Sequence, residues 1–169
     1  DSNKTGQSIS SASHIHLEMR AQCVYLRVAR VAVAQVVNHL GMAEKVGDTI
    51  VLAVEEALTN VIRHSYDGPC EKPIIIEINT IGCDDAGEQE ALEILIRDFG
   101  KQVDPETIKG RDLDEFKPGG LGVHIIKSVM DECQYTQASD TGMQLRLIKY
   151  LAPSKKDKNK PDSSDCHAK

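Results

Sequence analysis

The feature that most strongly limits the possible folds is the order of segments along the chain, in which two long helical segments stand among shorter segments typical of strands. Residues 22–40 and 43–66 have the length and apolar spacing of helices, and Gly41 is suited to end the first. Shorter segments with the composition of strands are found at residues 14–20, 73–80, 91–97, 133–138 and 143–151. The polar turn at 82–90 predicts a hairpin, and residues 122–132 predict a third helix. The chain therefore has the elements of an α+β fold.

Length and charge narrow the class of protein. The chain has 169 residues, which suits a single domain, and we expect this domain to span residues 14–151. The polar residues 1–13 predict a flexible lead-in, and the Lys- and Asp-rich residues 152–169 predict a disordered tail. The net charge is −6 and the tail carries +2, which leaves −8 on the body. An acidic body argues against nucleic acid as the main partner.

The sequence gives no indication of a membrane segment or a disulfide framework. No apolar run approaches the roughly 20 residues of a membrane span, and the first residues lack the apolar stretch of a signal peptide. Five cysteines are scattered without a Cys-x-x-Cys pair, which fits free thiols better than a zinc site. We therefore expect a cytoplasmic protein without membrane attachment.

The second helical segment has a polar side next to its apolar face. On a helical wheel, Glu56, Asn60 and Arg63 fall within about 60° of one another, with His64 beside them. Glu55 lies on the opposite flank of the apolar arc. Such a side is either a solvated face of mixed charge or a site for phosphate and Mg²⁺. In the second case an Asn oxygen holds the metal ion, and a carboxylate one turn away can act as general base.

Asp98 directly follows the strand at 91–97 and precedes Phe99 and Gly100. It can be an Asx-turn residue that closes the strand. It can also be a half-buried carboxylate, which needs hydrogen-bond donors, and the exocyclic amine of adenine is a suitable donor. The residues alone leave both interpretations open.

A long loop at residues 99–121 contains four glycines and two prolines, and such a loop inside a compact domain is often functional. It runs into the third helix through Lys117-Pro118-Gly119-Gly120-Leu121-Gly122. Glycines let backbone N–H groups approach an anion, and the N-terminus of a helix adds a partial positive charge. An ordinary flexible loop explains the same composition.

Three stretches together are much more specific than each one alone. In chain order they are Glu56-Ala-Leu-Thr-Asn60-Val-Ile-Arg63-His64, then Asp98-Phe99-Gly100, then Gly119-Gly120-Leu121-Gly122. With them the chain resembles the GHKL family of ATP-binding domains, most of all the bacterial anti-sigma factor serine kinases, over about residues 14 to 151. The resemblance implies an α+β two-layer sandwich in which helices cover one face of a mixed, mainly antiparallel sheet.

The resemblance also implies a role for each of these residues. Glu56 would be the general base, and Asn60 would hold Mg²⁺. Asp98, with Gly100 beside it, would bind the adenine of ATP. The other nucleotide-binding residues would come from the helix and from a glycine-rich ATP lid around the phosphates: Arg63, His64, Gly119, Gly120, Leu121 and Gly122.

The implied function is that of an ATP-dependent serine/threonine protein kinase and anti-sigma factor. It would phosphorylate an anti-sigma factor antagonist, sequester a sigma factor and form a homodimer. Gln102, Pro118 and Met143 depart from the family pattern, and they favour an alternative, a nucleotide-binding regulatory module without phosphotransfer. A detached histidine-kinase catalytic domain is a weaker alternative, because it needs an upstream helical hairpin and only polar residues 1–13 precede the first strand.

Overall fold

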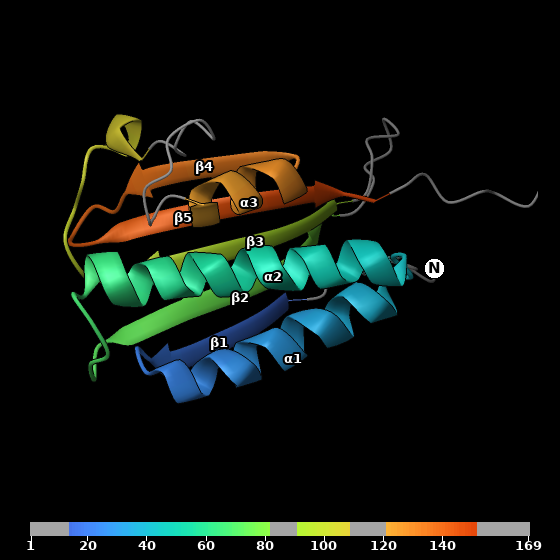
Figure 1. Ribbon diagram of the computed structural model, residues 1–169, viewed down its shortest axis with the longest axis horizontal. Coiled ribbons are helices and arrows are strands. Elements are labelled where there is room, and N and C mark those ends of the chain that lie inside the picture. Colours follow the sequence, from blue (N-terminus) through green and yellow to red (C-terminus); the bar gives the residue numbers. More distant parts are fainter. Residues whose placement is uncertain (1–13, 82–90, 109–120, 152–169) are drawn as a thin grey trace, which may run out of the picture.

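A computed structural model describes residues 14–81, 91–108 and 121–151 (Figure 1). Several sequence predictions fall outside these described residues: the lead-in at 1–13, the turn at 82–90, the tail at 152–169, and Pro118, Gly119 and Gly120 of the lid. No helix in the described part is long and apolar enough to cross a bilayer.

Five strands form one sheet in the order β1-β2-β3-β5-β4. They are β1 (His14–Arg20), β2 (Pro73–Ile81), β3 (Ala91–Asp98), β4 (Glu132–Gln137) and β5 (Met143–Tyr150). All four pairings between described strands are antiparallel, so the expectation of a mixed sheet is corrected. The strands β2 and β3, and likewise β4 and β5, follow each other in the chain and pair antiparallel, as in hairpins. The helical connections from β1 to β2 and from β3 to β4 also place β1 antiparallel to β2 and β5 antiparallel to β3.

In the described part of the chain, three α-helices lie side by side on one face of this sheet, as the expected two-layer sandwich requires (Figure 1). The central helix is α2 (Glu44–Asn60), with α1 (Cys23–His39) on one side and α3 (Leu121–Val129) on the other. At Gly47, α2 approaches α1 so closely that an added β-carbon would lie 2.8 Å from Cγ1 of Val37. Among the described residues, no helix lies on the other face of the sheet.

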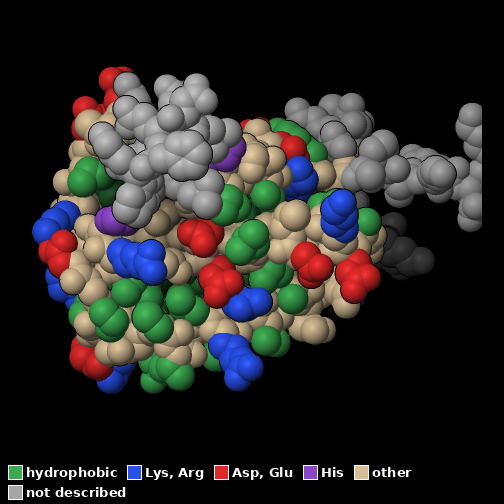
Figure 2. Space-filling view, in the orientation of Figure 1, with side chains coloured by type: hydrophobic (Ala, Val, Ile, Leu, Met, Phe, Trp, Pro, Cys, Tyr) green, Lys and Arg blue, Asp and Glu red, His purple; other side chains and the backbone are tan. Residues whose placement is uncertain are grey.

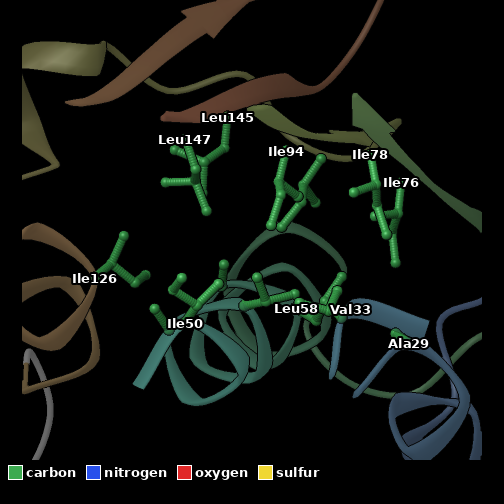
Figure 3. Packing of buried hydrophobic residues seen from close by; sticks show 14 of the residues in the cluster. Ala29, Val33, Ile50, Leu58, Ile76, Ile78, Ile94, Ile126, Leu145 and Leu147 are labelled. Atoms are coloured by element: carbon green, nitrogen blue, oxygen red, sulfur yellow. The ribbon is translucent and has the colours of Figure 1, made fainter. Parts of the chain in front are cut away.

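The core lies between α2 and the strands. The buried side of α2 includes the apolar positions expected on its core face, Ile50, Ala53, Val54, Ala57 and Leu58, together with Gly47. Every second side chain of β2 and β3 points toward α2 and is buried, because side chains alternate between the faces of a strand. Figure 3 shows Ile50 and Leu58 facing Ile94 and Leu147 of the sheet. Each such side chain stabilises the fold by about 1.5–3 kcal/mol relative to an exposed one.

The second helix differs from its prediction, because it is not regular up to residue 66. α2 ends at Asn60, and a π-helical turn, η1 (Val61–Ser65), follows it. The N–H of Tyr66 donates to the carbonyl of Val61 at 3.1 Å, the five-residue spacing of a π-helix. The wheel of 100° per residue therefore applies up to Asn60, and the positions of Arg63 and His64 do not follow from it.

Smaller differences occur at other boundaries. The helix expected at 122–132 ends at Val129, because the N–H of Asp131 donates to the carbonyl of Ile148 at 2.9 Å and the chain turns into β4. The loop that precedes it contains one short helical turn, η2 (Pro105–Thr107), capped by the side chain of Asp104.

Candidate functional site

Glu56 and Asn60 lie one turn apart on α2 and face the start of α3. A β-carbon placed on Gly122 would lie 2.6 Å from Oε2 of Glu56 and 3.4 Å from Nδ2 of Asn60. Any larger residue at Gly122 would therefore displace the carboxylate. Nδ2 of Asn60 is buried and donates to no acceptor among the described residues. Such a group is unfavourable by about 1–3 kcal/mol, which is expected where a ligand completes the site.

Asp98 ends β3 on the helical side of the sheet and is 3% exposed. Its Oδ1 accepts hydrogen bonds from Oγ of Ser65 at 2.5 Å and from the N–H of Gly100 at 2.9 Å. Gly142, with a φ of 72°, lies so close that an added β-carbon would be 2.7 Å from Oδ1. Within the described part of the chain, Oδ2 receives no donor. The carboxylate is therefore oriented from several sides and retains an acceptor for a ligand.

The π-helical turn η1 is attached to the end of β3 by side chains. Besides the bond from Ser65, the hydroxyl of Tyr66 accepts from the N–H of Phe99 at 2.8 Å and donates to the carbonyl of Pro73 at 2.6 Å. Burial raises the pKa of Tyr66, so the phenol stays neutral and keeps both bonds. Gly100 allows this contact, since a β-carbon there would overlap Ser65.

A cavity of about 250 Å³ lies between α2, η1, the start of α3 and the sheet. Its polar lining is Asn60, His64, Ser65, Asp98 and Gly122. Its apolar lining is Ala57, Val61, Ile96, Val103, Ile108, Val123, Tyr135, Met143 and Leu145. Burial raises the pKa of Tyr135 far above its ordinary value, so its hydroxyl is neutral on the cavity wall. A mostly apolar pocket with a few converging polar groups is typical of a small-molecule site.

The structure gathers most of the described residues that the sequence singled out. Asn60, His64, Asp98 and Gly122 line the cavity, and Glu56 lies at its edge against Gly122.

Two of the predicted residues lie elsewhere, and the lid is described only in part. Arg63 is exposed and is not part of the cavity lining, and Gly100 packs against Ser65. Leu121 is the first residue of α3.

No sequence pattern indicates Ser65 or Val103 as lining residues, because Ser65 lies on a π-turn and Val103 in an irregular loop. Tyr135 could have been identified from its alternate position in β4, which places it on the helical side with Cys133.

The surroundings of Asn60 fit a Mg²⁺ ion bound together with phosphate. Nδ2 of its amide is buried and has no partner among the described residues, and a half-turn about the last side-chain bond would present the oxygen in its place. Mg²⁺ keeps several waters and uses substrate phosphates, so a single protein oxygen is sufficient. The carboxylate of Glu56 is close by and can accept a hydrogen bond or a proton.

A known family matches this combination of fold and cavity. The family model of the histidine kinase-like ATPase domain matches residues 19–149. The chain belongs to this family. The resemblance to GHKL ATP-binding domains, and the α+β fold expected from it, are thereby confirmed.

Several curated relatives are similar over most of their length. A serine-protein kinase RsbW from Halalkalibacterium halodurans is 28% identical over 145 residues, 81% of this chain and 83% of the relative. Those from Listeria innocua and Oceanobacillus iheyensis are 25% and 26% identical, covering 86% and 88% of this chain and 92% and 94% of theirs. The similarity supports the kinase function expected from the sequence.

A solved structure has the same fold. One chain of the crystal structure of the SiaB–SiaC complex from Pseudomonas aeruginosa aligns with a TM-score of 0.53, covering 81% of this chain and 89% of its own length. The two sequences are 11% identical, so the likeness concerns the fold alone.

Proposed function

We propose that the chain binds ATP with Mg²⁺ and transfers the γ-phosphate to a serine or threonine hydroxyl of a partner protein. The observation that carries the proposal is the convergence of Glu56, Asn60 and Gly122 beside a cavity that extends to Asp98. Membership of the histidine kinase-like ATPase family supports ATP as the ligand. Similarity to serine-protein kinases supports the reaction.

The nucleobase would occupy the apolar part of the cavity. Its exocyclic amine would donate to Asp98, whose carboxylate is already oriented by Ser65 and Gly100. A charged acceptor makes a stronger hydrogen bond than a neutral one, so Asp98 would contribute a large part of the affinity. His64 and the amides at the start of α3 would lie toward the phosphates, and Arg63 would reach them only by moving from its exposed position.

Glu56 would act as the general base. The partner hydroxyl oxygen attacks the γ-phosphorus, the bond from this phosphorus to the ADP oxygen breaks, and the hydroxyl proton passes to the Glu56 carboxylate. Asn60 would hold Mg²⁺, which neutralises charge on the phosphates when bound. The N-terminus of α3, where Gly122 leaves space, has a partial positive charge that favours the same phosphates.

The partner would be an anti-sigma factor antagonist, and the chain would sequester a sigma factor when the antagonist is scarce. A surface of α1 supports a protein partner. Val24, Val28 and Val31 are 72%, 58% and 57% exposed, at successive turns of the helix side that faces away from the core. Hydrophobic side chains gather in this part of the molecule, over α1 and the C-terminal end of α2 (Figure 2).

Charge indicates the kind of segment that would bind there. α1 contains Arg27 and Arg30 and no acidic residue, although the chain as a whole has a net charge of −6. Because Arg30 lies 3.3 Å from Glu55 of α2, the surplus positive charge of this surface rests mainly on Arg27. An amphipathic segment with apolar residues flanked by acidic ones is complementary to this surface, which we call the α1 valine row (Val24, Val28, Val31). A second copy of α1 would place arginines against arginines, so the homodimer expected from the resemblance would use another surface.

A phosphotransfer assay tests the proposal. The chain is incubated with ATP labelled in its γ-phosphate, Mg²⁺ and a cognate antagonist, and the label is expected on the antagonist. Asn60→Ala should lower both ATP affinity and transfer, because it removes the metal ligand. ATP binding without transfer to any antagonist would replace the kinase by a nucleotide-binding regulatory module. A chain that does not bind ATP would contradict both functions.

A further inference from the structure

Arg97 lies directly behind the candidate nucleobase site, on the opposite face of the sheet. It precedes Asp98 in β3, and successive side chains of a strand point to opposite faces. Its side chain is only 15% exposed. The guanidinium lies over the ring of Phe99, 4.3 Å from the centroid. Arg97 is therefore largely buried and held in place, although no described helix covers this face of the sheet.

The guanidinium holds the connection between β4 and β5 at two points, in the middle of the turn and at the start of β5. Nη2 is 2.5 Å from Oδ1 of Asp140, and Nη1 donates to the carbonyl of Met143 at 3.4 Å. Gly142 lies between these two anchored residues and packs against Asp98. Met143 itself lines the cavity. Arg97 therefore holds a turn whose backbone packs closely against Asp98.

A pair of amides fastens the same turn to the loop that follows Asp98. Nε2 of Gln102 donates to the carbonyl of Ala138 at 2.7 Å, and Nε2 of Gln137 donates to the carbonyl of Val103 at 3.1 Å. Val103 belongs to the cavity lining. The two hydrogen bonds therefore join the loop after Asp98, which lines the cavity, to the turn that Arg97 holds.

We propose that Arg97, acting with Asp140 and Gln102, positions Asp98 for the nucleobase from the far face of the sheet. The inference rests on the proposed binding of ATP and adds a positioning residue that does not touch the nucleotide. Without Arg97, the turn at Gly142 would be free to move away from Asp98, and the carboxylate would lose one of the surfaces that orient it.

The test compares ATP affinity in Arg97→Ala, in Asp140→Asn and in the unchanged chain. Both variants should bind ATP roughly tenfold more weakly, within the range of coupling found in one hydrogen-bond network. Arg97→Lys keeps a positive charge for Asp140 but cannot also reach the carbonyl of Met143. Its affinity for ATP should therefore lie between that of the unchanged chain and that of Arg97→Ala. Asp140 is 61% exposed, so its variant should fold even if Arg97→Ala does not.

Arg146→Ala is the matched control. Arg146 lies in the neighbouring strand β5 and pairs with Glu93 at 2.6 Å, and it does not line the cavity. Its loss should leave ATP affinity unchanged, whatever it does to the melting temperature.

A double-mutant cycle separates positioning from general stability. If Arg97 acts through Asp98, then Arg97→Ala should weaken ATP binding much less in an Asp98→Asn background than in the unchanged chain. Equal losses in both backgrounds, or a lower melting temperature with unchanged ATP affinity, would overturn the inference and leave the proposed function intact. A parent chain without ATP affinity would overturn both.

Discussion

At the scale of single residues, a substitution of Glu56 should lower the rate of phosphotransfer without changing the affinity for ATP. Glu56→Gln keeps the shape of the side chain and removes the base. We expect the rate of phosphotransfer to fall by roughly 10²–10⁴-fold, the usual contribution of a general base. ATP affinity should stay nearly unchanged, because the cavity lining is preserved. Initial rates with the antagonist and a separate ATP titration measure the two quantities.

The neighbouring glutamate is a built-in control for this prediction. Glu55 faces α1, where its carboxylate lies 3.3 Å from the guanidinium of Arg30. The two side chains are 52% and 30% exposed, and ion pairs that solvent reaches contribute little to stability. Glu55→Gln should therefore leave both transfer and ATP affinity close to those of the parent. Loss of transfer in Glu55→Gln, with activity retained in Glu56→Gln, would show that the roles of the two carboxylates are reversed.

The position of Asp98 could be predicted from the sequence, but its surroundings could not. A carboxylate at the end of an apolar strand, followed by glycine, indicates a half-buried acceptor. One of its donors is local, the N–H of Gly100, but Ser65 of η1 and Gly142 of the turn before β5 lie 33 residues before and 44 residues after it in the chain. Contacts at such separations depend on the assembled sheet, and no local pattern encodes them.

At the scale of elements, the junction between η1 and β3 should depend on the hydroxyl of Tyr66. Tyr66→Phe leaves the N–H of Phe99 without its acceptor and the carbonyl of Pro73 without its donor. We expect a loss of about 1–3 kcal/mol in the free energy of unfolding, as for an unsatisfied buried group. Urea unfolding of the two proteins measures the difference. An unchanged midpoint would mean that water replaces both bonds.

The same hydroxyl predicts a dependence on alkaline pH. Burial raises the pKa of Tyr66 in the folded chain above its ordinary value of 10.0. Its contribution to stability is therefore complete below about pH 10 and is lost as the pH rises further, because the unfolded chain releases the proton first. Between about pH 9 and 11, the melting temperature of Tyr66→Phe should fall less than that of the parent. Parallel curves would contradict this.

The regular elements could be predicted, and the π-turn could not. Apolar residues at Ala57, Leu58, Val61 and Ile62 fit an α-helix that continues without interruption. The apolar pattern does not indicate the change to π spacing, because Ile62 is an expected core residue of an α-helix and is also buried in the π-helical turn. The shift is selected by tertiary bonds to β3, which place Ser65 beside Asp98. Irregular helical turns of this kind often occur at functional sites.

At the scale of the whole molecule, α1 is unusual because both of its sides are rich in valine. Val33 and Val37 explain the inner side, since they are buried against α2 and the sheet. Nothing in the described fold covers the α1 valine row on the outer side. Valine is a poor helix former, so local propensity does not favour it at exposed helical positions. A protein partner that covers the row explains why valines are found there.

Val28→Glu tests this explanation, because it places a negative charge in the centre of the α1 valine row. The position is 58% exposed, so the substitution should leave the fold and ATP affinity unchanged. Affinity for an acidic, apolar partner segment should fall by roughly tenfold or more, as for a central interface residue. Ile81→Glu is the matched control, since Ile81 is 39% exposed at the end of β2, away from α1. If both variants bind the antagonist and the sigma factor as the parent does, the partner binds elsewhere. If Val28→Glu instead loses phosphotransfer while keeping ATP affinity, the α1 valine row holds the substrate during the reaction.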